Sequence, residues 1–144
     1  MKALSLALLL LAWSCRGQTW QDYAVGAVIC GEAANQGPAG MKAVAEVIQT
    51  RSAIKHVTPY QTVTRPWAFS SLNGTTVPAL VRKWEVQPGY PEAVRLAMKI
   101  GHIDGSITRG ATHFTRSNER PLWARHKRPV AVIGDHSFYR LSRW

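Results

Sequence analysis

Apolar positions in the first half of the chain recur at helical spacing. Across residues 20–34, apolar and small side chains repeat every three or four positions, and a stronger repeat covers residues 39–51. Gly37-Pro38 separates these two segments, and proline suits the first turn of a helix. A further apolar repeat spans residues 91–100. The pattern therefore predicts three helices, the first two separated by a short break.

The pattern is different in the rest of the chain. Residues 52–89 are predicted to be rich in loops, because prolines and an Asn73-Gly74 turn interrupt them. Segments 110–116 and 130–141 alternate between apolar and polar residues, and Gly134-Asp135 breaks the second one. Alternation of this kind predicts two or three short strands in a small antiparallel sheet. Helices followed by strands predict an α+β fold.

The N-terminus follows a pattern of its own. Met1-Lys2 precede an apolar run over residues 3–13, and Ser14-Cys15-Arg16-Gly17 then place small residues at plausible cleavage positions. The run is too short to span a membrane, and the whole segment is typical of a secretory signal peptide. We therefore expect residues 1–17 to be a signal peptide. Residues 18–144 would then form one domain without a membrane span, secreted or located in the periplasm or cell envelope. A lipoprotein signal with lipid on Cys15 is a less favoured alternative, because Trp13 fits that motif badly.

Composition narrows the partners that suit such a domain. After residue 17 a single cysteine remains, Cys30, which excludes a disulfide within the domain and is expected to be a small buried residue. The 18 lysines and arginines outnumber the 8 acidic residues, which gives a net charge of +10. A basic surface suits a polyanion, and for an exported protein the anionic polymers of a cell wall are natural candidates. Nucleic acid is not expected, since the basic residues are scattered along the chain.

One acidic residue stands in an otherwise apolar or small-residue stretch. Glu32 lies within ICGEAANQGPAG (29–40), near the end of the first predicted helix. Apolar surroundings disfavour the charged form of a carboxylic acid, and such an acid can protonate a leaving-group oxygen near neutral pH. The stretch alone leaves two interpretations open, a catalytic acid or a solvated glutamate at a helix end.

Histidines and aromatic residues supply further candidates. His113 and His136 lie in the strand-like segments and, with Asp135 or Asp104, would suit a zinc ion. The sequence has no HExxH motif, however, so hydrogen bonding or substrate contact is favoured for both histidines, and no metal or other cofactor is predicted. Aromatic rings at a cleft can stack on sugars, although such residues are more often core. Those in the loop and strand segments are Trp67, Phe69, Trp123, Phe138 and Tyr139.

Three motifs occur in a fixed order along the chain. They are CGEAANQGPAGMKAVAEVIQTR (30–51), WAFSSLN (67–73), and GATHFTRSNERPLWAR (110–125) followed by IGDHSFYR (133–140). Together they resemble the motifs of the SleB-type cell wall hydrolases, the spore-cortex-lytic family. The resemblance covers about residues 22 to 140, and the order and spacing of the motifs make it specific.

The resemblance implies a lysozyme-like fold, with a mainly helical body and a small sheet beside a glycan cleft. It implies cleavage of the bond between N-acetylmuramic acid and N-acetylglucosamine in the glycan strands of peptidoglycan, with Glu32 as the catalytic acid. The better-characterised members are lytic transglycosylases, in which a single carboxyl group acts first as acid and then as base. Further residues in or beside the motifs are predicted to contact substrate or orient Glu32: Ser70, Trp67, Phe69, His113, Trp123, His136 and Tyr139.

The chain also departs from the family pattern. Gln36 stands where many members have a second glutamate, and Ala68 where they have glutamine. These departures leave open a basic wall-binding module without activity. Cleavage by water would need a second carboxylate or a held water, and Asp135 and Glu119 are the candidates for that carboxylate. A zinc-dependent wall amidase that uses His113 and His136 is the remaining alternative.

Overall fold

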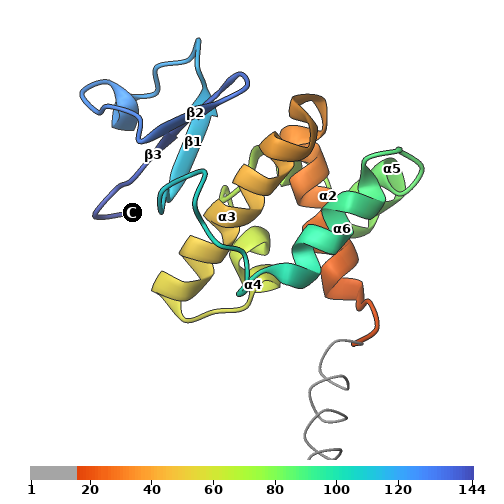
Figure 1. Ribbon diagram of the computed structural model, residues 1–144. Coiled ribbons are helices and arrows are strands. Elements are labelled where there is room, and N and C mark those ends of the chain that lie inside the picture. The colour runs from red at the N-terminus through yellow and green to blue at the C-terminus, as the bar shows by residue number, and fades with distance from the viewer. Residues whose placement is uncertain (1–15) are drawn as a thin grey trace, which may run out of the picture.

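The computed structural model describes residues 16–144, which form a helical body with a small sheet beside it (Figure 1). Most of the predicted signal peptide, Cys15 included, lies outside the described residues. The α-helices are α2 (Trp20–Ala33), α3 (Gly37–Lys55), α4 (Pro59–Thr64), α5 (Val77–Trp84) and α6 (Tyr90–Lys99). The strands are β1 (His113–Arg116), β2 (Ala131–Ile133) and β3 (His136–Tyr139). This order confirms the predicted α+β fold. Across residues 16–144, no helix combines the length and apolar character needed to cross a membrane.

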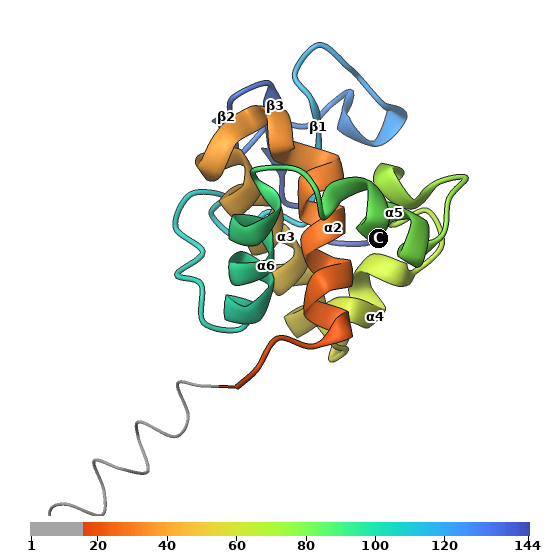
Figure 2. The same ribbon diagram turned by 90° about the vertical axis from the view of Figure 1, so that its right-hand side faces the viewer.

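The central element of the helical body is α2, which packs against α3, α4, α5 and α6 (Figure 2). A capping box begins it: the N–H of Asp22 donates to Thr19 Oγ1, and the N–H of Thr19 donates to the Asp22 carboxylate. Gly26 allows α6 to approach, because a Cβ there would lie 2.8 Å from Val94 Cγ2. The last turn of this buried helix carries Glu32, so the surrounding helices fix the position of that carboxylate.

The second helix, α3, extends beyond its predicted end at residue 51. Pro38 lies in its first turn, and the helix ends at His56, whose backbone is left-handed with a φ of 53°. Its apolar face packs in the core, but two charged side chains, Glu46 and Arg51, are also buried on it. Both form hydrogen bonds with the segment between α6 and β1.

Residues 52–89 contain more helix than the sequence predicted. The helices α4 and α5 and the short 3-10 helix η2 (Ser70–Leu72) lie there, so the prediction of a loop-rich segment was wrong. Pro59 and Pro78 lie in the first turns of α4 and α5, where a missing N–H costs no hydrogen bond. Thr58 and Thr76 cap these two helices. The prolines thus begin helices in this segment rather than interrupting it.

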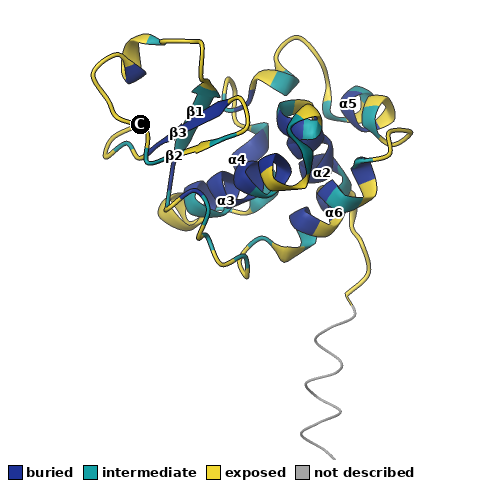
Figure 3. Ribbon diagram, turned by 45° about the horizontal axis from the view of Figure 1, so that its top comes forward, coloured by how far each residue is buried: buried dark blue, intermediate teal, exposed yellow. Residues whose placement is uncertain are grey.

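The sheet is antiparallel, with the strand order β1-β3-β2 and all of β3 buried (Figure 3). The predicted break at Gly134-Asp135 is the turn between β2 and β3. On the central strand, Phe138 packs against Ala43 and Val47 of α3 and against Ala111. This contact anchors the sheet to the helical body.

Candidate active site

Glu32 is half-buried near the C-terminal end of α2, and its carboxylate is held by η2. The main-chain N–H of Ser71 donates to Oε1 at 2.8 Å, and Ser70 Oγ lies 3.2 Å from both carboxylate oxygens. A Cβ on Gly31 would lie 2.5 Å from Ser71 Cβ, so only glycine lets η2 approach this closely. The motifs at 30–51 and 67–73 therefore meet at one carboxylate.

Three adjoining hollows form a groove between the helical body and the sheet. The helix-end hollow, of about 750 Å³, is lined by Glu32, Gln36, Trp84 and His136, among others. The central hollow, of about 460 Å³, also includes Glu32 and His136 and extends to Arg51. The aromatic hollow, of about 430 Å³, begins at Arg51 and contains several rings. Glu32 thus lies where the first two hollows meet.

Arg51 is the buried cation of this groove. Its Nε donates to the carbonyl oxygen of Thr112 at 2.6 Å and its Nη1 to that of Ala68 at 3.0 Å. Its guanidinium also lies over the ring of Phe69, 4.9 Å from the centroid. Burial lowers the pKa of Arg51 to about 10, while the carboxylate of Glu32 acts in the opposite direction. Arg51 therefore stays charged at neutral pH and contributes positive potential near Glu32.

Sequence reasoning did not identify Arg51 as a site residue. It was noted only as part of the motif that ends at residue 51. One signal could have revealed it. Arg51 follows Val44, Val47 and Ile48 at helical spacing, so a charged residue continues the apolar face of the helix.

Three buried polar side-chain atoms near Glu32 have no hydrogen-bond partner among residues 16–144. They are Ser71 Oγ, Trp84 Nε1 and His136 Nδ1. Burial lowers the pKa of His136, while the nearby Glu32 carboxylate opposes that shift. Buried polar groups are almost always hydrogen-bonded in folded proteins, so these three atoms are available to partners from outside the described residues.

Gln36, the departure from the family pattern, joins the end of α2 to the sheet. Its Oε1 accepts the main-chain N–H of Asp135 at 2.8 Å, and its Nε2 donates to Asp135 Oδ2 at 3.4 Å. Gly134 has a φ of 56°, and a Cβ there would lie 2.3 Å from Gln36 Oε1. A glutamate could accept the first bond but would oppose the Asp135 carboxylate. The amide at position 36 is therefore matched to the acid at position 135.

We expect Gln36→Glu to lower the free energy of unfolding by about 1 kcal/mol at neutral pH and low salt, because two like charges then face one another near the surface. The double variant Gln36→Glu/Asp135→Asn should recover most of that loss, since asparagine can donate to the new carboxylate. Urea unfolding of both single variants and the double variant measures the coupling. Equal stability of Gln36→Glu and the unchanged protein would contradict this account.

The structure brings only some of the predicted site residues close to Glu32. Ser70, Phe69 and His136 line the central hollow with Glu32, although Phe69 is also part of the core. A second group lies together in the aromatic hollow, one step along the groove: Trp67, His113 and Trp123. Tyr139 is buried, packs edge-on against Trp123 and lines none of the three hollows, so a sugar contact for it stays a prediction.

Both candidates for a second carboxylate share a hollow with Glu32. Asp135 lines the helix-end hollow, where Gln36 holds it. Glu119 lines the central hollow and accepts a hydrogen bond from Thr115 Oγ1 at 3.0 Å. Either residue therefore lies in a position from which it can activate a water molecule in the groove.

The other chemistries considered from the sequence gain no support from this geometry. Within residues 16–144, no three His, Cys, Asp or Glu side chains are grouped closely enough to hold a metal ion. His113 and His136 lie at opposite ends of the β1–β3 ladder, and Asp104 pairs with Lys42 instead. Cys30 is buried, as predicted, and burial raises the pKa of its thiol to about 11, which makes it a poor nucleophile.

A carboxyl group that two donors hold in a groove between helices and a small sheet is suited to acid–base chemistry. The Cell Wall Hydrolase family model matches residues 35–139, and the chain belongs to that family. Membership makes the chain a hydrolase that acts on peptidoglycan, outside the cytoplasm. Searches of curated proteins and of solved structures gave no match. The matched range includes Ser70 and His136 and begins three residues after Glu32.

Proposed function

We propose that the protein cleaves the glycosidic bond between N-acetylmuramic acid and N-acetylglucosamine in peptidoglycan, as a lytic transglycosylase with Glu32 as both acid and base. One observation carries this proposal. The Glu32 carboxylate is fixed by two donors of η2 and lies where two hollows of the groove meet. Membership of the cell wall hydrolase family supports the choice of polymer.

In the proposed reaction, protonated Glu32 first gives its proton to the glycosidic oxygen, and the bond from that oxygen to C1 of the muramic residue breaks. Positive charge then develops at C1. The resulting Glu32 carboxylate takes the proton of the C6 hydroxyl of the same sugar, and the C6 oxygen bonds to C1. The products are a 1,6-anhydro end and a free hydroxyl on the leaving sugar. Glu32 is protonated again and no water is consumed.

The structure supports a role for Ser70 and Ser71 in aiming this carboxylate. Their two donors leave the acid little freedom to rotate, so the same oxygen can face the leaving group and then the C6 hydroxyl. His136 and Trp84 carry unpartnered buried atoms at the groove and are the side chains we assign to sugar hydroxyls. The competing route is hydrolysis, in which Asp135 or Glu119 would activate a water.

Mass spectrometry of digested peptidoglycan distinguishes these routes. Digestion in heavy-oxygen water should yield anhydro-muramic ends that carry no heavy oxygen. Reducing ends that do carry heavy oxygen would instead show hydrolysis and overturn the transglycosylase assignment. Digestion of the same material by a hydrolytic muramidase is the control that must incorporate the label.

Action on a wall also requires export, and we propose that residues 1–17 supply the signal. The basic start, the apolar run and the small residues at its end support this. If cleavage follows Gly17, N-terminal sequencing of the exported protein should begin at Gln18. A different first residue would show that the signal peptide is cleaved at another position.

A further inference from the structure

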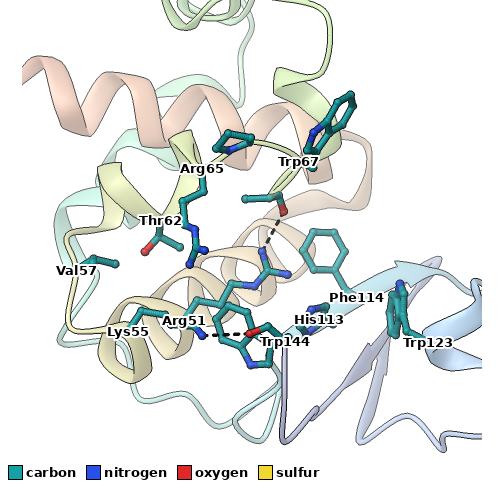
Figure 4. A pocket seen from close by; sticks show the side chains of 12 residues that line it. Arg51, Lys55, Val57, Thr62, Arg65, Trp67, His113, Phe114, Trp123 and Trp144 are labelled. Carbon is teal, nitrogen blue, oxygen red and sulfur yellow. Dashed lines mark hydrogen bonds between the residues drawn. The ribbon is translucent and has the colours of Figure 1, made fainter.

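The groove continues away from Glu32 into the aromatic hollow, which is basic as well as aromatic (Figure 4). Its volume of about 430 Å³ is within the range of small-ligand sites. Arg51 and Lys55 of α3 and Arg65, which follows α4, line it, whereas no aspartate or glutamate does. Its rings belong to Trp67, His113, Phe114, Trp123 and Trp144.

None of these three cations forms an ion pair with an aspartate or glutamate of residues 16–144, where the ion pairs involve other basic residues. Arg51 is only 8% exposed and lies between the rings of Phe69 and Trp144, at 4.9 and 5.5 Å. Lys55 Nζ lies 4.4 Å from the Trp144 ring centroid and donates to the main-chain oxygen of Trp144 at 3.1 Å. Carbonyl groups and rings thus hold the guanidinium of Arg51 in place without neutralising its charge. Such charges favour carboxylates, which form short, charge-assisted hydrogen bonds.

The histidine of the hollow adds no positive charge at neutral pH. Burial, and then the charge of Arg51, lower the pKa of His113 to about 4. Its ring lies 5.3 Å from Trp123 and 5.4 Å from Trp144. The hollow therefore has an uncharged aromatic side and a cationic side, which suits a ligand with a carboxylate on an otherwise compact body.

The aromatic hollow is continuous with the catalytic part of the groove. It shares Arg51, Ala68 and Phe114 with the central hollow, and Glu32 lines the central hollow. A substrate whose reacting bond lies at Glu32 can therefore extend a side group into the aromatic hollow.

Uncharged sugars give no reason for three cations in one hollow, whereas peptidoglycan carries peptide stems with free carboxylates on alternate sugars of its strands. We propose that the aromatic hollow binds the carboxylates of a peptide stem attached to the strand, with Arg51, Lys55 and Arg65 as the charged contacts. The inference rests on the proposed function, because it takes peptidoglycan as the substrate at Glu32. With this contact the enzyme would recognise the peptide stems of the strand as well as its sugars.

Two substrates test the inference: glycan strands that carry their stems, and the same strands after an amidase has removed the stems and the lactyl carboxylate left on each muramic residue has been capped as an amide. Lys55→Glu/Arg65→Glu is the informative variant, because both side chains are exposed and reversal of their charges should leave the fold intact. Arg82→Glu/Lys99→Glu is the matched control, since these exposed residues line none of the three hollows. Thermal melting verifies that both variants fold.

The unchanged protein should prefer stem-bearing strands by about tenfold or more in kcat/KM, the scale of one hydrogen bond to a charged group. Lys55→Glu/Arg65→Glu should bring that ratio close to one, and the control variant should retain it. Equal turnover of the two substrates by the unchanged protein, or a ratio that the charge reversal does not alter, would overturn the inference and leave the proposed function intact.

Direct binding separates the inference from the proposed function. Calorimetry with an isolated stem peptide should show binding that is lost in Lys55→Glu/Arg65→Glu and when the carboxylates of the peptide are capped as amides. Binding of the peptide by a protein that cleaves neither strand would support the inference and refute the proposed function. Binding of inorganic phosphate, but not of the peptide, would overturn the inference in favour of a phosphate-bearing wall polymer.

Discussion

Glu32→Gln is expected to lower the release of soluble fragments from peptidoglycan by about 10²–10⁴-fold, the usual contribution of a positioned proton donor. Glutamine matches glutamate in size, and its amide oxygen can still accept the main-chain N–H of Ser71. It has no acidic proton to give, so both steps of the proposed reaction fail. Fragment release is measured by mass spectrometry, and urea unfolding should show a stability close to that of the unchanged protein.

The control for this prediction is Glu85→Gln, which makes the same change at an exposed position that lines none of the three hollows. It should retain full activity. Substantial fragment release by Glu32→Gln would remove Glu32 from the mechanism and turn attention to Asp135 and Glu119. If the unchanged protein binds wall material and releases nothing, the chain is a wall-binding module instead.

The sequence predicted the elements whose signals are local. Apolar spacing identified α2 and α3, and the alternation after residue 110 identified the strands, because a helix face and a strand face each repeat within a few residues. A role for Ser70 in contacting substrate or orienting Glu32 was also predicted from sequence, but only through the resemblance of their two motifs to one family. Spacing alone left Glu32 undecided between an acid and a solvated helix end.

The sequence did not predict features that depend on distant partners. Prolines in residues 52–89 indicated loops, yet Pro59 and Pro78 begin helices whose stability comes from packing against the helical body. The separation of His113 from Glu32 was equally hidden, because it depends on how the sheet packs against α3. Short-range patterns carry no information about which hollow a side chain will line.

The buried charged residues of α3 show most clearly how a feature can depend on residues far away in the sequence. A glutamate within a helical repeat usually indicates a solvated face, but Glu46 is fully buried. Its Oε2 accepts the main-chain N–H of Thr108 at 2.8 Å and Thr108 Oγ1 at 2.7 Å, and its Oε1 accepts the N–H of Ile107 at 3.4 Å. These bonds fix the segment that enters β1, which carries His113 and Phe114 to the groove.

We therefore expect Glu46→Ala to lower the free energy of unfolding by about 3 kcal/mol, because it leaves two or three buried donors without an acceptor and opens a cavity in the core. Glu46→Gln should cost about half as much, since its amide oxygen can still accept from Thr108 while its NH₂ group opposes another donor. Urea unfolding measures both values. Glu92→Ala is the control for the loss of a glutamate from a helix, because Glu92 lies on α6 and is only partly buried. A loss below about 1 kcal/mol for Glu46→Ala would mean that the segment is held by its apolar contacts alone. The expected loss would instead make the buried carboxylate of Glu46, which lines none of the three hollows, the anchor that sets the sheet side of the groove.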